Sequence, residues 1–533
     1  MAFIVIVLGR PCMFAQTGLF VWSLQMQEIF RIFHHQKPNP TIMKRLLPVF
    51  ITVAFIIHSF PCLPQDFNES PELRGMESIS SHELMAYVSE MASEKYGGRL
   101  TGTPGYDSIA QWLVGHFRRW GIQGGAPQGG YYQYFDIPYT RVYPGCSVTL
   151  HLPQRNREIR KHYDYVKEFI PGATSASGTI KAEVVYAGYG ITAPELGYDD
   201  YEGIDVEGKI VLMEREVPLN PGDDPEQFQK WEPYSRHPYK LKNAVRQGAA
   251  GMLYNYGPIV NPNNAYDPGF IYSHVGDTVV RDLFAGTGRA HKQVTEAIKE
   301  KLKPRSFSME KEVTITNRTE HFPDGKGSNV IGFLEGSDPE LKDEVILVSA
   351  HLDHLGRCWE LIPGANDNAS GVAVMMGMAR ALSDYDIRLK RSVMFLAFGA
   401  EEQGIVGSKV YVESPSLPLD QSYVLLNLDG VGVGNKIGVV AGKNYPDRYN
   451  YVKQANDQYT HRYLNPSKFL NVSRPRLDAA RFMKAGVPIL SFYAYGAPSV
   501  YHQPGDDVDK ITPEIMEELS QMLYMTVIEM ANR

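Results

Sequence analysis

The chain has 533 residues, of which 43% are hydrophobic and 21% charged, and its formal net charge is −7. This length allows more than one domain and a substantial core. The negative charge and the lack of a basic cluster argue against a nucleic-acid partner. Four cysteines are too few for a disulfide scaffold.

The N-terminal region has the pattern of an export signal. Residues 43–65 begin with two basic residues, continue with an apolar stretch from Leu46 to Ile57, and end in a proline-rich exit. A membrane span needs roughly 20 apolar residues, and this stretch is shorter. We therefore expect a cleaved signal peptide, an exported protein (periplasmic, extracellular or at the cell surface) and no stable membrane span in its mature form.

The placement of this signal also indicates where the protein begins. Residues 1–65 form a preface followed by the signal, and Met43 is the expected true start. A retained N-terminal anchor is the alternative. Lipidation of Cys62 is a further one, although the small residues expected before a lipidated cysteine are missing.

Residues 77–145 predict helix, loop, helix and strand, in that order. In SSHELMAYVSEM, Ser80 and Glu83 have the spacing of a capping box. The stretch SIAQWLVGHFRRWGI has the spacing of apolar residues expected of an amphipathic helix, and GGYYQYFDIPYTRV is typical of an extended strand. We expect this region to be the first part of an α/β domain.

Residues 146–320 have a different character and predict a separate, β-rich inserted domain. KAEVVYAGYGI and GKIVLMER are typical of strands, and LKNAVRQGAAGMLYNY of a helix followed by a strand. The interval VPLNPGDDPEQFQKWEPYSRHPY, rich in proline and charge, is expected to be a loop.

Residues 321–533 alternate strand and helix to the end of the chain. EVILVSA, SVMFLAFG, YVLLNLD and VPILSFY are continuous apolar runs, as in parallel strands buried on both faces. Helical patterns separate them, and another closes the chain. The predicted fold class is therefore α/β, a three-layer sandwich around a mostly parallel central sheet.

Polar residues follow these runs at the positions where ligands gather in such sheets, beyond the carboxyl ends of the strands. They come from separate elements of the chain: His351, Asp353, Asp367, Glu401, Glu402, Asp429 and His502. Imidazole and carboxylate ligands without thiolate suit zinc and, less exclusively, manganese or cobalt. The sequence therefore predicts a metal centre at this edge.

Two histidines and three carboxylates can hold two metals if one carboxylate bridges them, and Asp367, at a helix start, is the natural bridge. The adjacent acids Glu401 and Glu402 then have distinct roles, Glu402 as a ligand and Glu401 as general base toward the attacking water. Taken alone, such an acidic pair is more often a solvated turn.

Neighbouring polar residues are expected to play other parts. Asp353 is expected to orient His351 from outside the ligand set, and His354 is not expected to be a ligand. Asp506 and Asp507 are expected to be surface or helix-leading acids.

Five motifs together resemble the co-catalytic zinc aminopeptidases, metallopeptidase family twenty-eight. They are SAHLDHLG, PGANDNASGVA, FGAEEQGIVGS, LNLDGVG and VYHQPGDD, and GGRLTGTPGYDSIAQWL is similar to that family's opening helix and loop. YAGYGI, DYEGIDVEGKIVL and KNAVRQGAAGML resemble the protease-associated domain often inserted in these enzymes.

The resemblance implies a ligand set for each of two zinc ions. One set is His351, Asp367 and Asp429, and the other is Asp367, Glu402 and His502. The resemblance also implies that Glu401 shuttles the proton, that Asp353 supports His351 and that Tyr501 stabilises the oxyanion. SRPRLDAARFMKAGVP matches another family region loosely, through Asp478 and Phe482, but lacks its usual histidine.

The function these features predict is that of an exported zinc exopeptidase that removes N-terminal residues from peptides. A carboxypeptidase of the same fold is the alternative, and Arg474, Arg476 and Arg481 could then line a pocket for a terminal carboxylate. A non-catalytic receptor on the same scaffold is the third reading, but such relatives usually lose a ligand or the base, and here all are present.

Overall fold

The computed structural model describes residues 70–154, 157–385, 387–469 and 476–533. The export signal expected within residues 43–65 lies outside these ranges, as does Arg474. Within them, no helix combines the length and the hydrophobicity needed to cross a bilayer.

A nine-stranded sheet organises the larger part of the molecule, with the order β1-β15-β19-β16-β20-β23-β21-β22 and β2 paired to β15. The four central strands β19, β16, β20 and β23 run parallel, and β15 and β21 flank them antiparallel. The strands are β1 (Gln123–Gly124), β2 (Tyr132–Asp136), β15 (Lys326–Leu334), β16 (Val345–His351), β19 (Ser392–Phe398), β20 (Ser422–Leu428), β21 (Lys436–Val440), β22 (Leu464–Pro466) and β23 (Ile489–Tyr495).

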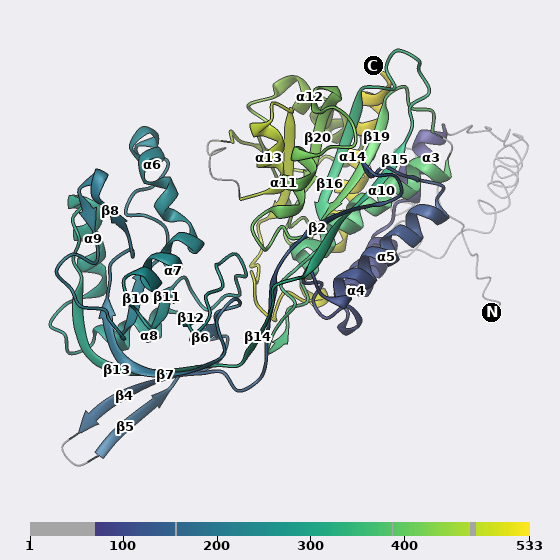
Figure 1. Ribbon diagram of the computed structural model, residues 1–533. Coiled ribbons are helices and arrows are strands. Elements are labelled where there is room, and N and C mark those ends of the chain that lie inside the picture. The colour runs from purple at the N-terminus through teal and green to yellow at the C-terminus, as the bar shows by residue number, and fades with distance from the viewer. Residues whose placement is uncertain (1–69, 155–156, 386, 470–475) are drawn as a thin grey trace, which may run out of the picture. The chain divides into compact units, whose positions relative to one another are not determined.

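Helices cover both faces of this sheet (Figure 1). One hydrophobic core joins the sheet to α4 (Ser81–Met91), α5 (Pro104–Arg119), α10 (Gly371–Asp384), α12 (Pro446–Ala455) and α14 (Pro513–Asn532). A second core on the opposite face joins it to α11 (Val406–Glu413) and α13 (Asp478–Lys484). The short helix α3 (Pro71–Ser78) packs on α10 and α14.

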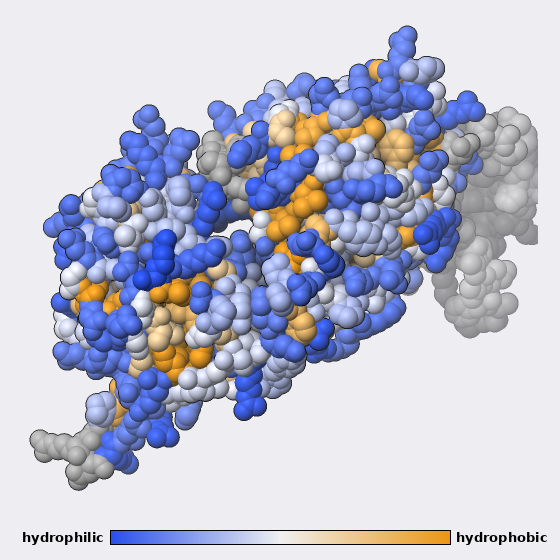
Figure 2. All heavy atoms as spheres, viewed as in Figure 1, coloured by the Kyte–Doolittle hydropathy of each residue, from blue (hydrophilic) through white to orange (hydrophobic). Residues whose placement is uncertain are grey.

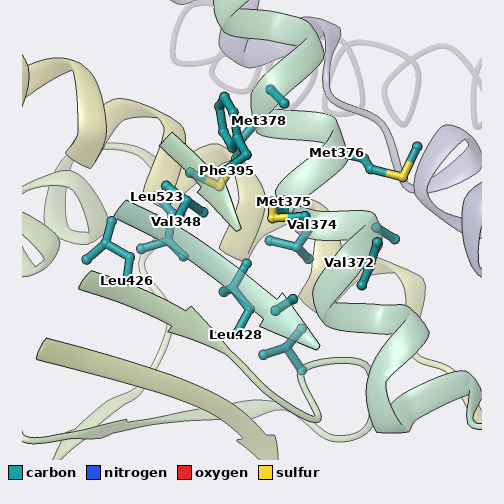
Figure 3. Close-up of a cluster of buried hydrophobic side chains, with 14 of the residues drawn as sticks. Val348, Val372, Val374, Met375, Met376, Met378, Phe395, Leu426, Leu428 and Leu523 are labelled. Atoms are coloured by element: carbon teal, nitrogen blue, oxygen red, sulfur yellow. The ribbon is translucent and has the colours of Figure 1, made fainter. Parts of the chain in front are cut away.

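The apolar side chains of each central strand alternate between the two faces of the sheet, and this alternation produces the three-layer arrangement. Leu347 belongs to one core and Val348 to the other, because successive side chains of a strand point to opposite faces. Figure 3 shows the core under α10, where Val348, Phe395 and Leu426 of three neighbouring strands meet the helix. The predicted fold class, an α/β sandwich around a mostly parallel sheet, is confirmed.

A second, eight-stranded sheet lies between the two parts of the chain that build the first, with the order β5-β4-β13-β7-β10-β11-β12-β6. Its strands are β4 (Ser147–Gln154), β5 (Arg157–His162), β6 (Phe169–Pro171), β7 (Gly178–Tyr186), β10 (Ile210–Glu214), β11 (Gly251–Asn255), β12 (Ile271–Val275) and β13 (Phe307–Asn317). It has hydrophobic cores of its own. The stretch from β4 to β13, residues 147–317, is hereafter the inserted segment.

Short elements complete the inserted segment and join it to the rest. A small sheet has the strand order β14-β3-β17-β18. It pairs β3 and β14, which precede and follow the inserted segment in the chain, with the hairpin β17–β18. The remaining elements are α6 (Pro225–Trp231), α7 (His237–Arg246), α8 (Asp277–Phe284), α9 (His291–Lys301), β3 (Tyr139–Val142), β8 (Thr192–Ala193), β9 (Tyr198–Asp199), β14 (Thr319–Phe322), β17 (Arg357–Cys358) and β18 (Glu360–Leu361). Figure 2 shows a face that hydrophilic residues mostly cover, with hydrophobic groups in patches.

Helix caps explain where the predicted boundaries hold and where they fail. Ser80 caps α4 as expected, because its hydroxyl accepts the N–H of Glu83 at 3.3 Å. The prediction of a loop over residues 217–239 was wrong in part, since this interval contains α6 and leads into α7. Asp224 caps α6 and Pro225 occupies its first turn, where a proline is tolerated because its missing N–H would be unpaired anyway.

Shortening Leu426 tests the central sheet. Leu426 is fully buried between α10 and neighbouring strands, so Leu426→Ala removes buried surface and leaves a cavity. We expect a loss of about 2–5 kcal/mol in the free energy of unfolding, measured by chemical unfolding of the purified protein. Leu419→Ala is the control, because Leu419 is only half-buried and should cost clearly less. Equal losses would contradict this assignment of the core.

Candidate metal centre

The predicted ligands lie at one edge of the central sheet because the strands that carry them run parallel. His351 is the last residue of β16, Glu401 and Glu402 follow β19 after a two-residue turn, and Asp429 directly follows β20. These strands are hydrogen-bonded neighbours, so their carboxyl ends meet. Asp367 comes from the turn before α10, and His502 from the loop after β23.

A first group of ligand atoms surrounds the imidazole of His351. Its Nε2 atom lies 3.2 Å from Oδ1 of Asp367 and 3.6 Å from Oδ1 of Asp429. The three side chains can hold one metal ion. Nδ1 of His351 faces the backbone carbonyl of Asp353 at 3.2 Å, so Nδ1 donates there and the lone pair of Nε2 points at the two carboxylates.

A second group shares Asp367 with the first. Nε2 of His502 lies 3.0 Å from Oε2 of Glu402 and 3.3 Å from Oδ2 of Asp367. The other Asp367 oxygen belongs to the first group, so its two oxygens face different groups. The geometry expected of a bridging carboxylate is therefore present.

The spacing of these atoms fits zinc. Ligands about 2.0–2.2 Å from a tetrahedral zinc ion stand roughly 3.3–3.6 Å from one another. The four imidazole–carboxylate distances above, from 3.0 to 3.6 Å, lie close to that range. The donors are imidazole nitrogens and carboxylate oxygens, a set that zinc accepts.

His354 also lies in this region. Its Nδ1 is 2.8 Å from Oε1 of Glu402, so it could reach a metal together with Asp367 and Glu402. His502 has contacts to both of these carboxylates within 3.3 Å, whereas the ion-pair contact of His354 is with Glu402. We interpret His354 as the residue that orients Glu402.

The two adjacent glutamates differ in environment. Among the protein groups alone, burial raises the pKa of Glu401 well above its usual value, whereas His502 overcomes the effect of burial on Glu402 and lowers the pKa of Glu402 to about 2. Glu401 therefore tends to hold a proton and Glu402 tends to be ionised. An ionised Glu402 can serve as a ligand, whereas a base at Glu401 needs a neighbouring cation to keep its carboxylate in the charged form.

Asp353 holds the turn that carries both glutamates. Its carboxylate accepts the N–H of Glu401 at 3.1 Å and the N–H of Glu402 at 3.3 Å. The same carboxylate is 3.7 Å from Nδ1 of His351, longer than the contact from its backbone carbonyl. Asp353 thus positions the Glu401–Glu402 turn with its side chain and His351 chiefly with its main chain.

The expectation that Asp506 is a surface acid was wrong. Asp506 is 2% exposed, and its two carboxylate oxygens accept the N–H groups of Asn366 and Asp367 at 2.9 and 3.0 Å. It fixes the turn that presents the shared ligand. Asp507, its neighbour, is exposed as expected.

Arg99 supports the site and was not predicted from the sequence. It is fully buried, and its guanidinium donates to the carbonyls of Met91, Leu352, Pro363 and Gly364 at 2.7–3.0 Å. Burial lowers its pKa to about 10, so it stays cationic at neutral pH beside the acidic cluster. An arginine within the glycine-rich loop GGRLTG was the signal that could have revealed it.

The inserted segment contributes to the orientation of His502. Nδ1 of His502 lies 2.8 Å from the carbonyl oxygen of Val260, and the N–H of Val260 donates to the carbonyl of His502 at 3.0 Å. The Nδ1 hydrogen bond directs Nε2 toward the carboxylates. Tyr501, half-exposed, stacks on the His502 ring with centroids 3.6 Å apart.

Two cavities open beside the ligands. One of about 330 Å³ includes His351, Asp367 and Asp429, and part of its wall is apolar, formed by Val440, Leu477, Phe492 and Tyr493. The other, of about 460 Å³, extends toward the inserted segment. Glu401, Glu402, Arg476, Tyr501 and His502 line both, so the candidate metal centre lies where the cavities meet.

A third group of possible ligands lies in the inserted segment, formed by His151, Glu158 and Glu312. It was not predicted from the sequence, because Glu312 lies far along the chain from His151 and Glu158. Lys181 already lies 2.7 Å from Glu312 and 3.5 Å from Glu158. We interpret this group as an ion-pair network.

Comparison with known proteins agrees with this geometry. Residues 329–527 match the family model described as peptidase family M28. The chain is 30% identical over 368 residues to aminopeptidase YwaD of Bacillus subtilis (strain 168), covering 67% of this chain and 70% of that protein. It therefore belongs to peptidase family M28, as its motifs indicated. This membership confirms the predicted class of enzyme, a metallo-aminopeptidase.

Solved structures share the fold. An aminopeptidase from Aneurinibacillus sp. strain AM-1 superposes with a TM-score of 0.61 at 19% identity, over 86% of this chain and 96% of its own. A zinc aminopeptidase from Bacillus subtilis does so with a TM-score of 0.57 at 22% identity, over 85% and 96%. Both matches extend well beyond the 329–527 region and so include much of the inserted segment.

Replacing Asp353 tests its positioning role. In Asp353→Asn, one carboxylate oxygen becomes an NH₂ group that cannot accept an N–H from the glutamate turn. We expect a loss of about 10–100-fold in zinc affinity or in kcat/KM, measured by chelator competition and by hydrolysis of an aminoacyl nitroanilide. Asp507→Asn, the same change at an exposed site, is the control. Wild-type values for Asp353→Asn in both assays would contradict the role.

Proposed function

We propose that the protein is an aminopeptidase that uses two zinc ions to hydrolyse N-terminal residues from peptides. His351, Asp367 and Asp429 would hold one ion, and Asp367, Glu402 and His502 the other. The observation that carries this proposal is the pair of ligand groups that share Asp367, each with imidazole–carboxylate distances suited to one zinc ion. A single-metal site would leave one of these buried groups without a purpose.

Zinc bound there would polarise the scissile carbonyl and make water acidic enough to attack it near neutral pH. Glu401 is the residue to accept the proton from that water and return it to the departing amine. Support for this role comes from its place at the junction of the two cavities and from the Asp353 hydrogen bond that fixes its main chain.

Other side chains would bind and orient the peptide. The cavity that contains Asp429 combines carboxylates with apolar walls, which suits an N-terminal ammonium group and its side chain. Tyr501 is half-exposed beside His502, and its hydroxyl is our candidate donor to the oxyanion formed at the scissile carbon.

We also propose that the inserted segment is a protease-associated domain. Its separate sheet and separate cores support this assignment, as do the motifs that resemble that domain. The contact between Val260 and His502 indicates that it helps to shape the active site. Export by way of residues 43–65 belongs to the same proposal, on the basis of their sequence pattern.

Exchanging each adjacent glutamate for alanine separates the base from the ligand. Glu401→Ala should keep two zinc ions per chain and lose activity by a factor of at least about 10²–10⁴, as is typical when a general base is removed. Glu402→Ala should instead lose zinc, because it removes a ligand. Metal content by elemental analysis and kcat/KM on the same preparations measure both effects.

The control for this pair is Glu413→Ala, which removes an exposed glutamate from α11 and should change neither zinc content nor rate. Wild-type turnover in Glu401→Ala would contradict the base assignment. Full zinc content in Glu402→Ala would contradict the ligand assignment.

The direction of cleavage is tested with blocked peptides. Acetylation of the N-terminus removes the ammonium group that the acidic cavity would bind, and we expect kcat/KM to fall by about two orders of magnitude, the scale of a lost charge-assisted contact. Mass spectrometry of the products identifies the residue released. Release of a C-terminal residue from the acetylated peptide would instead establish the carboxypeptidase alternative.

A further inference from the structure

The cavity of about 460 Å³ has an unusual concentration of positive charge. Residues of the inserted segment and of the larger part of the molecule line it. Four of them are cationic: Arg236 in the inserted segment, and Arg476, Arg481 and Lys484 beyond β22. The acids on its lining are Glu216 and the pair Glu401–Glu402. Since that pair belongs to the proposed metal centre, the rest of the cavity lining has four cations and one acid, Glu216.

Arg481 is the cation nearest to the chemistry that the structure identifies. It lies on α13, and its Nη2 is 3.5 Å from the carbonyl oxygen of Gly404. Gly404 closes the turn that begins at Glu401, since its N–H donates to the Glu401 carbonyl at 3.0 Å. The Arg481 guanidinium thus lies one short turn away from the proposed proton shuttle.

The hydrogen-bonding capacity of Arg481 is poorly used. It is half-buried, and its Nε is inaccessible to solvent and has no hydrogen-bond partner. No carboxylate of the described ranges lies within 4 Å of Arg481 or of Lys484, whereas Arg236 pairs with Glu232 at 3.0 Å and Arg476 with Glu216 at 2.7 Å. Burial is the main cause that lowers the pKa of Arg481. Asp478 opposes this shift, and Arg236 adds to it, which indicates that Arg236 lies near Arg481. Cations gathered in this way favour an anion between them.

The two cavities share Glu401, Glu402, Arg476, Tyr501 and His502 but differ in the charged residues that line only one of them. His351, Asp367 and Asp429 line only the smaller cavity, which suits the ammonium end of a peptide, whereas Arg236, Arg481 and Lys484 line only the larger one. With the ammonium end in the smaller cavity, the leaving portion of the peptide extends from Glu401 into the larger one. The basic cavity begins at Glu401 and continues past Gly404 and Ile405 to Arg481.

We propose that this basic cavity binds a carboxylate on the residue that follows the scissile bond, with Arg481 as its principal partner and Lys484 as an accessory one. The carboxylate is either the C-terminus of a dipeptide or an acidic side chain at the second position of a longer peptide. The guanidinium fork of Arg481 suits either source, because it can donate two parallel hydrogen bonds to one carboxylate. The proposal rests on the aminopeptidase function and narrows its substrates.

Matched substrates test the two sources with the zinc-loaded full chain. Leu-Ala against Leu-Ala-NH₂ isolates the terminal carboxylate, and Leu-Glu-NH₂ against Leu-Gln-NH₂ isolates the side chain. We expect kcat/KM to favour the carboxylate by about tenfold or more in at least one pair, the scale of a hydrogen bond to a charged group. In Arg481→Gln that ratio should fall toward one, and in Lys484→Gln, an exposed position safe for folding, it should fall in part.

Lys409→Gln is the matched control, since it removes an exposed cation of α11 that does not line the cavity and should leave the ratio unchanged. Equal rates within both pairs would overturn the proposal, as would a preference that survives in Arg481→Gln and Lys484→Gln. A preference only for Glu-Ala-NH₂ over Gln-Ala-NH₂ would also overturn it, because the carboxylate would then lie on the first residue. Hydrolysis of leucine 4-nitroanilide, which has no carboxylate, reports separately on the aminopeptidase function.

Discussion

The constraint on which the structure depends is the burial of several carboxylates at one edge of one sheet. Asp353, Asp367 and Glu402 are all less than 10% exposed, and they lie close to Glu401 and Asp429. Burial is the largest cause that raises the pKa of Asp353 to about 7 and that of Asp478 to about 6, although His351 acts in the opposite direction on both. Like charges in such a place repel strongly, and a cluster of this kind is stable in its ionised form when dications share it.

Much of the surrounding structure fixes the main chain rather than the ligands themselves. Arg99 donates to four carbonyl groups, one at the end of α4 and three in the loops near the site. Asn368 joins two ligand-bearing turns, because its side chain bonds the carbonyl of Leu428 and the N–H groups of Gly371 and Gly430. Asp506 holds the N–H of Asp367. The ligand atoms can therefore stay in place although their own charges would drive them apart.

The sequence predicted the parts of the site that follow from strand geometry. Buried parallel strands appear as apolar runs, and the residue after each run marks the sheet edge, so His351, Glu402 and Asp429 could be placed from the sequence. Arg99 and Asp506 could not be placed, because they act through hydrogen bonds to main-chain groups that are mostly distant in sequence. The helix α6 was missed for a different reason, since a proline in a first helical turn and one in a loop look alike in sequence.

The inserted segment contributes to both features that the proposed function uses, the candidate ligands and the basic cavity. The edge of the central sheet carries most of the candidate ligands, the candidate base and the smaller cavity. The segment adds Val260, whose carbonyl faces Nδ1 of His502, and Arg236, which lines the larger cavity together with Arg481 and Lys484 of α13. In the function we propose, the segment would orient one ligand directly and would support a charge selection that depends chiefly on Arg481. A substitution that shifts the segment against the central sheet would therefore act on both.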